Sequence, residues 1–283
     1  EDNDYGPISG SGSMEGKLQW PAAIIADSQE NLLVSDEASH RISTFTKDGN
    51  YLGSWGQQGD QDGQFNRPSG MAFDSDQNVY VADTLNHRIQ KFTKDGTFVI
   101  KFGGYGTSDG NLNMPWGISV DEVDNVYVAD WRNDRIVKFT SEGDFLMNFG
   151  GAGNGDGQFN RPSGVAVDVD GDIYVADRGN NRVQLFDRYG TYVEKFIGDA
   201  TLSPSGRKYI LSNAVTLRLR ETSASLEPVK RLRGPISVKV DECGHMYIPD
   251  YGSHRIQIYK KEAYDLDETQ IAPVPRSPTL YTA

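Results

Sequence analysis

Short apolar runs that alternate with polar residues recur along the chain. From Gly164 the sequence reads GVAVDVDGDIYVAD, in which two runs of branched and aromatic residues flank a turn built from Asp and Gly. The runs NNRVQLF and TYVEKF follow at a spacing of about ten residues. Alternation with a period of two is typical of strands. The pattern therefore predicts a four-stranded antiparallel sheet with two apolar faces, which has to pack against other sheets.

This unit repeats. Its most constant segment has an Asp followed five residues later by an Arg, and it occurs as VSDEASHRISTF, VADTLNHRIQKF, VADWRNDRIVKF, VADRGNNRVQLF and IPDYGSHRIQIY. The acids of these segments are Asp36, Asp83, Asp130, Asp177 and Asp250, and a proline keeps the same spacing at Pro21, Pro68, Pro115, Pro162 and Pro235. Three gaps are 47 residues long and the fourth is 73. The sequence therefore holds five units, with 26 extra residues between the fourth and the fifth.

The second unit resembles a known repeat. Its run NHRIQ at residues 86–90, preceded by Tyr-Val-Ala-Asp and followed by Lys-Phe, is similar to the NHL repeat, and the resemblance covers about residues 21–260. It implies a β-propeller, an all-β fold of four-stranded antiparallel blades packed around an axis, often with six blades. NHL propellers serve as RNA- or protein-binding modules in tripartite-motif proteins, as sensor domains of bacterial kinases and as the amidating-lyase enzyme. The chain contains no RING, B-box or kinase segment that would bring the activities of those larger proteins.

Five blades are expected, and six are the alternative because six units of 47 residues would use almost the whole chain. Tyr5-Gly6 aligns with the Phe-Gly that ends other outer strands, at Phe102 and Phe149. We therefore expect residues 1–6, or residues upstream of them, to supply the outer strand of the last blade. This organisation places one propeller over residues 1–262, followed by an extended acidic and Pro-rich tail over 263–283.

The composition of the chain disfavours several classes of function. The chain has 283 residues, a formal charge of −12 and one cysteine, Cys243, which excludes an intramolecular disulfide and a Cys-cluster metal site. No apolar run approaches the 18 residues of a transmembrane helix, so a soluble protein is expected. The acidic charge disfavours nucleic acid, which binds through Lys and Arg. Glu1 is not Met and no signal peptide is visible, so the chain is interpreted as processed, partial or lacking its first residues, and the compartment stays open.

Residues that repeat in every unit are interpreted as structural, because a catalytic group is needed once. The Asp–Arg pairs are expected to tie the second and third strands of each blade together. His40, His87 and His254 occupy equivalent positions, but at middle radius the blades are too far apart for one metal ion. The Gly-rich loops at 103–110 and 150–157 are expected to be exposed turns, and the acidic run Asp168–Asp172 a β-turn rather than a calcium loop.

Residues that differ between units are the candidates for a site. The loops that precede the inner strands and those that join strands two and three lie on one face of a propeller, where function usually resides. Aromatic residues and Arg are favoured in recognition surfaces. The candidates on this face are Trp116, Trp131, Arg132, Arg67, Arg161, Arg178 and Tyr251.

The insertion at 199–234 is expected to form a lid over the same face. Ser203-Pro204 favours a helix start, and a helical stripe favours a helix over the alternative of a hairpin. The lid is basic while the rest of the chain is acidic, and its candidate binding residues are Arg207, Lys208, Arg218 and Arg220.

These observations favour a non-catalytic propeller that presents a lidded face to a protein partner or a small anionic ligand. No catalytic residue, cofactor or metal is predicted. The first alternative is a lyase or hydrolase with Ca²⁺ or Zn²⁺ on the propeller axis, but the starts of the inner strands offer no His. The second alternative is RNA binding through the basic insertion. The sequence does not identify the ligand, the partner or the oligomeric state.

Overall fold

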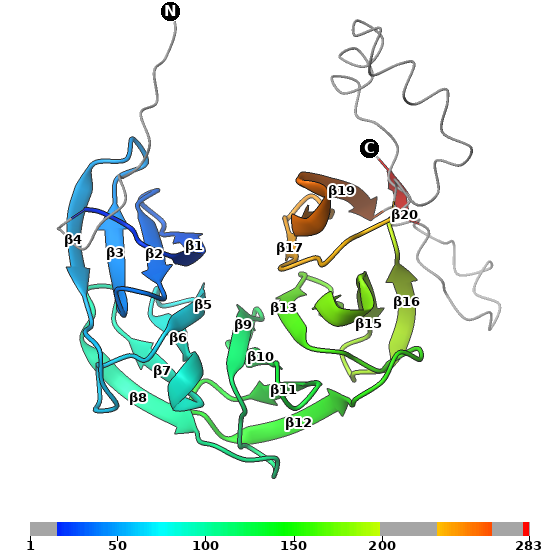
Figure 1. The fold of residues 1–283 in the computed structure, drawn as a ribbon, viewed down its shortest axis with the longest axis horizontal. Helices are drawn as coiled ribbons and strands as arrows, with labels where there is room; N and C mark the ends of the chain where they lie inside the picture. The colour runs from blue at the N-terminus through cyan, green and yellow to red at the C-terminus, as the bar shows by residue number, and fades with distance from the viewer. Residues whose placement is uncertain (1–15, 199–230, 262–279, 283) are drawn as a thin grey trace, which may run out of the picture.

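A computed structural model describes residues 16–198, 231–261 and 280–282 of the chain. These residues form five four-stranded antiparallel sheets arranged in a ring (Figure 1). The fold is a five-bladed β-propeller, as the five sequence units predict. Within the described residues there is no α-helix, and the helix expected in the insertion at 199–234 lies almost entirely outside them.

The strands follow the sequence units one by one. Blade 1 contains β1 (Pro21–Ala26), β2 (Leu32–Asp36), β3 (Arg41–Phe45) and β4 (Tyr51–Trp55). Blade 2 contains β5 (Pro68–Phe73), β6 (Val79–Asp83), β7 (Arg88–Phe92) and β8 (Phe98–Gly103), and blade 3 contains β9 (Pro115–Val120), β10 (Val126–Asp130), β11 (Arg135–Phe139) and β12 (Phe145–Gly150). Blade 4 contains β13 (Pro162–Val167), β14 (Ile173–Asp177), β15 (Arg182–Phe186) and β16 (Tyr192–Phe196). Blade 5 contains β17 (Lys239–Val240), β18 (His245–Asp250), β19 (Arg255–Lys261) and β20 (Leu280–Thr282).

Single 3-10 turns join the second and third strands in three blades. These turns are η1 (Thr84–Asn86), η2 (Arg178–Asn180) and η3 (Tyr251–Ser253). Each ends at a residue in the left-handed region, with φ between 51° and 57°: His87, Asn181 and His254.

The hydrophobic core lies between blades rather than within them. Each pair of consecutive blades encloses one cluster of buried side chains. Between blades 2 and 3, for example, Tyr80 and Ile89 pack with Ile118, Val126 and Phe139. Because the side chains of a strand alternate between its faces, each blade supplies one set of apolar residues to the blade before it and another to the blade after it. Fully burying one such side chain contributes about 1.5–3 kcal/mol.

The inner strands approach one another closely around the axis. A Cβ added to Gly117 would lie 2.8 Å from the Cα of Gly164 and 2.8 Å from the carbonyl oxygen of Ser163 in the next blade. Glycine is required here because no side chain fits between the two backbones. At this position the backbones of neighbouring inner strands therefore pack directly against each other.

The outer strand of blade 5 comes from the C-terminal end of the chain. β20 pairs with β19, with Thr282 opposite Tyr259 and Leu280 opposite Lys261. The prediction that residues 1–6 supply this outer strand is therefore wrong where β20 pairs with Tyr259–Lys261. Residues 1–6 lie outside the described part of the chain, as do residues 263–279 of the expected tail, so the domain boundary at 262 stays a prediction.

Candidate functional site

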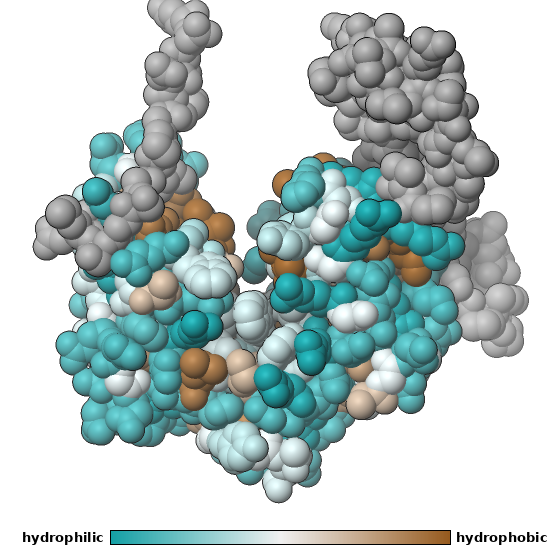
Figure 2. Space-filling model, in the orientation of Figure 1, coloured by the Kyte–Doolittle hydropathy of each residue, from teal (hydrophilic) through white to brown (hydrophobic). Residues whose placement is uncertain are grey.

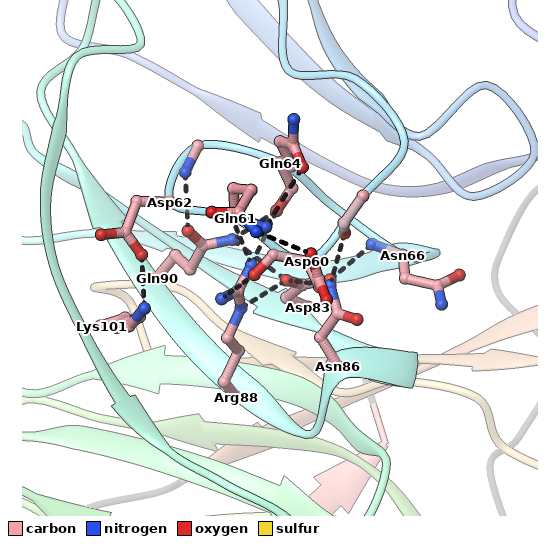
Figure 3. Close-up of polar contacts among 12 residues, drawn as sticks. Asp60, Gln61, Asp62, Gln64, Asn66, Asp83, Asn86, Arg88, Gln90 and Lys101 are labelled. Atoms are coloured by element: carbon pink, nitrogen blue, oxygen red, sulfur yellow. Dashed lines mark hydrogen bonds and ion pairs between the residues drawn. The ribbon is translucent and has the colours of Figure 1, made fainter.

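The repeated Asp–Arg pair organises each blade (Figure 3). In blade 2 the buried carboxylate of Asp83 accepts hydrogen bonds from the backbone N–H of Asn66, and from the side chains of Asn86, Arg88 and Gln90, at 2.7–3.0 Å. The Arg88 guanidinium also donates to the carbonyl oxygens of the loop that leads into the blade, at Asp60, Gln61 and Gln64. The pair therefore fixes the inter-blade loop to the blade.

The same ion pair occurs in four of the five blades. Its distances are 2.7 Å for Asp83–Arg88, 2.9 Å for Asp130–Arg135, 2.7 Å for Asp177–Arg182 and 3.0 Å for Asp250–Arg255. In blade 1, Arg41 instead donates to the carbonyl oxygen of Lys17. The structural interpretation is confirmed in blades 2–5.

The repeated histidines join neighbouring blades. The Nδ1 atoms of His40 and His87 accept hydrogen bonds from the backbone N–H groups of Arg67 and Met114, each at 3.0 Å. Accepting through Nδ1 requires a neutral imidazole. Burial lowers the pKa of both histidines, which favours the neutral form.

The acidic run at Asp168–Asp172 forms the turn between β13 and β14, as expected. The Lys261 ammonium lies 2.8 Å from a carboxylate oxygen of each of Asp168, Asp170 and Asp172. Lys261 belongs to blade 5, so the cluster is a contact between blades. Across residues 16–198 and 231–261, no group of three His, Cys, Asp or Glu side chains is arranged to hold a metal ion.

A cavity of about 690 Å³ lies on the propeller axis. The inner strands of all five blades line it, and Figure 2 shows the surface hollowed at this place. Four of the predicted residues lie in its wall: Arg67, Trp116, Arg178 and Tyr251. Four residues predicted from the sequence, one each from blades 2, 3, 4 and 5, therefore converge on one space.

Several residues of the wall were missed, among them Trp20, Glu37 and the cationic Lys239. Trp20 and Glu37 also line the cavity, and Trp20 is 61% exposed. Trp20 precedes Pro21 as Arg67 precedes Pro68, and Glu37 follows Asp36 as Arg178 follows Asp177. The repeat position was therefore a signal that could have found both of them.

Three other candidates form a cluster beside the cavity. The ring of Trp131 lies 5.7 Å from that of Trp116, and the guanidinium groups of Arg132 and Arg161 lie 5.3 and 5.2 Å from the Trp131 ring. Trp116 thus belongs to both the cavity and this cluster. The candidates Arg207, Lys208, Arg218 and Arg220 lie outside the described residues.

The arginines of this face differ from the repeated ones in their partners. Within the described part of the chain, Arg67, Arg132, Arg161 and Arg178 form no ion pair within 4.0 Å, whereas Arg88, Arg135, Arg182 and Arg255 all do. The pKa of Glu37, which lies near Arg67, is raised by burial although Arg67 opposes the shift. The face is therefore locally cationic on a chain whose net charge is −12.

Comparison with known proteins supports the repeat. The sequence model of the NHL repeat matches residues 65–92, 112–139 and 159–186. These segments are NHL repeats. Each runs from the inter-blade loop through the third strand of blade 2, 3 or 4. The match is consistent with an NHL-repeat β-propeller, and a search of curated proteins found no match.

Several solved structures share the propeller fold of this chain. Virginiamycin B lyase from Staphylococcus aureus gives a TM-score of 0.56 at 14% identity, over 93% of this chain and 70% of that chain. A catalytically inactive variant of that enzyme with a histidine replaced by alanine, solved with quinupristin, gives 0.55 at 14% over 89% and 68%. The nidogen/laminin complex gives 0.59 at 17% over 84% and 74%. At such identities the likeness shows the fold alone.

No helix in the described segments has the length and apolar character needed to cross a bilayer. Cys243 is exposed and forms no disulfide.

Proposed function

We propose that this NHL propeller is a binding protein whose axial cavity takes a small ligand with an anionic group and an aromatic or apolar portion. The observation that carries the proposal is that cationic and aromatic side chains line the same cavity. Arg67 and Arg178 have no ion-pair partner among the described residues. The aromatic side chains are those of Trp20, Trp116 and Tyr251.

The chemistry of these side chains defines the ligand. A guanidinium group binds a carboxylate or phosphate through two parallel hydrogen bonds, and Arg is less strongly hydrated than Lys. Aromatic rings bury apolar surface at little cost in conformational entropy. A cavity of about 690 Å³ is within the range of small-molecule sites. An anionic aromatic compound satisfies all three features.

Catalysis is supported less well than binding. The described lining of the cavity offers one carboxylate, Glu37, and no imidazole, and this is not a donor set for zinc. The lyase that shares the fold loses activity when one histidine is replaced by alanine. A lyase function here would have to use Glu37 as its acid or base, a role for which the raised pKa is the favourable observation.

A protein partner is the second candidate. The cluster of Trp131, Arg132 and Arg161 lies outside the cavity lining, and two arginines stacked on an indole suit an acidic side chain at the centre of an interface. An acidic segment of a protein that contacts both Trp116 and Trp131 would use the whole face.

Calorimetric titration with benzoate, indole-3-acetate and the matching uncharged amides tests the proposal. We expect the carboxylates to bind and the amides to bind at least about tenfold more weakly, because a hydrogen bond to a charged group contributes about 1.5–3 kcal/mol. Arg67→Ala and Arg178→Ala should each abolish this preference. Arg188→Ala is the matched control, because Arg188 donates to the Asp170 carbonyl oxygen and does not line the cavity. Equal binding of acids and amides would contradict the proposal.

A further inference from the structure

Two kinds of contact recur wherever consecutive blades meet. One is the hydrophobic cluster described above. The other is a hydrogen bond from a backbone N–H before the inner strand to a left-handed residue of the preceding blade. The acceptors are His40, His87, Asp134 and Asn181, and the donors are Arg67, Met114, Arg161 and Gly234. Within the described residues, neither contact joins blade 5 to blade 1.

As a result, the face of blade 5 that is turned away from blade 4, its forward face, is exposed. Ile256 is 64% exposed and Ile258 is 39% exposed. The residues at the position of Ile256 in blades 2 and 3 are Ile89 and Ile136, and both are 0% exposed. The side chain of Ile256 therefore has the chemistry of an interface residue without a neighbouring blade to cover it.

The face of blade 1 that is turned away from blade 2, its rear face, likewise lacks a neighbouring blade to cover it. Ile24 is 52% exposed, whereas its counterparts Met71, Ile118 and Val165 are 2–3% exposed. The backbone N–H of Trp20, which corresponds to the donor Arg67, turns back to the carboxylate of Asp36 in its own blade. His254 has the left-handed conformation of the acceptors, with φ 51°.

The two faces bound an open side of the ring. Figure 1 shows blades 1 and 5 standing apart, and hydrophobic residues appear on both sides of the opening in Figure 2. Four packed junctions fix the angles between the five blades, so bringing blades 1 and 5 together would strain every junction, because packed interfaces do not deform continuously.

We propose that this opening is a docking surface for a blade-like β-sheet of another polypeptide. The occupant needs two apolar faces, because it meets an apolar wall on each side. Its recognition chemistry follows from the four existing junctions: a backbone N–H that reaches Nδ1 of His254, and a short acceptor side chain that receives the N–H of Trp20. These are the features of one further repeat unit, so the surface continues an interface that the chain already uses four times.

A chain with one added repeat tests this directly. A copy of residues 112–158 replaces residues 1–17, so that Gln158 of the copy is followed by Leu18 as Gln158 is followed by Phe159 in the native sequence. A second fusion uses residues 65–111. We expect at least one fusion to be a folded monomer that binds less of a hydrophobic dye than the full chain does.

Charge substitutions show whether the added sheet occupies the opening. Ile256→Asp should leave the melting temperature of the full chain almost unchanged but lower that of the fusion by more than about 5 °C, because the charge is then buried. Val99→Asp is the matched control, because Val99 is 43% exposed on β8, away from the opening. It should have the same small effect in both proteins.

Any one of the following outcomes would contradict the proposal. An equal loss of melting temperature in the full chain would mean that the chain's own residues already cover Ile256. A dimer of the full chain that Ile256→Asp dissociates would assign the surface to a second copy. If neither fusion folds, or if Ile256→Asp is neutral in a folded fusion, the opening does not accept a blade.

Discussion

The imidazole of His87 accepts a hydrogen bond through Nδ1 from the backbone N–H of Met114, at 3.0 Å, and this bond joins blade 2 to blade 3. His40 makes the same bond to Arg67. A histidine at this position is therefore a connector between blades, and its protonation removes the acceptor.

Stability should consequently depend on pH. The pKa of His40 and His87 is lowered in the folded protein by burial, so the unfolded chain binds protons more tightly. The stabilising contribution is full above the unfolded pKa of about 6.5 and is lost as the pH falls below it. We expect the free energy of unfolding in urea to decrease between pH 7 and pH 5. His40→Asn with His87→Asn should reduce this dependence, since Asn181 makes the same bond in blade 4. An unchanged pH profile would contradict this role.

Removing one acid of the repeated pair should destabilise the fold. Asp177→Ala leaves Arg182, which is only 5% exposed, without its carboxylate. Breaking a buried ion pair costs about 3–5 kcal/mol. Urea denaturation measures the loss, and Asp62→Ala is the control because that acid is half exposed and its ion pair is with the exposed Lys101. A variant with native stability but without ligand binding would show that the pair serves the site instead.

Gly117→Ala tests the close approach of the inner strands. The added Cβ would lie 2.8 Å from backbone atoms of the next blade, so strands β9 and β13 would have to separate. Overpacking of this kind costs about 1–3 kcal/mol. Gly53→Ala is the control, because no atom lies within 4 Å of a Cβ there. Equal melting temperatures of the two variants would exclude a steric requirement for Gly117.

Anion binding in the cavity should strengthen as the pH is lowered. The pKa of Glu37 is raised by burial, so this carboxylate becomes neutral at a higher pH than an exposed Glu and ceases to compete for Arg67. We expect the affinity for benzoate to rise between pH 7 and pH 5. Glu37→Gln should bind more tightly at pH 7 and lose this dependence on pH. If the slope of affinity against pH survives in Glu37→Gln, another group is responsible.

The insertion should be dispensable for folding and required for binding. We expect replacement of 201–230 by a loop such as 150–160 to leave a folded propeller with weaker ligand binding and greater binding of a hydrophobic dye. Circular dichroism and titration check both parts. A chimera that fails to fold would place the insertion in the core.

The sequence predicted what the repeat determines. The 47-residue spacing gave the five blades, and the Asp–Arg offset gave the pair seen in blades 2–5. The role of the left-handed residues was not predicted, although His40, His87, Asp134 and Asn181 share a short acceptor side chain. The residue type shows that the side chain can accept a hydrogen bond. Which backbone N–H donates to it depends on the angle between neighbouring blades.

The site was predicted in part for a related reason. Arg67, Trp116, Arg178 and Tyr251 stood out because their types differ between units, and they meet at the axis. Trp131 stood out because it has no counterpart in the other units, but it lies beside the cavity, in contact with Trp116 and two arginines. Sequence comparison between units finds variable positions, whereas their distance from the axis depends on loop conformation.

The division of the core into clusters has a genetic consequence. In the part of the chain that the structure describes, each cluster draws its side chains from two consecutive blades, so the core of a unit packs against its immediate neighbours. Recombination between two copies of the 47-residue unit would delete or duplicate one whole blade and would rejoin surfaces that already fit. A gene of this kind can change its number of blades in one event, with no substitution at any junction.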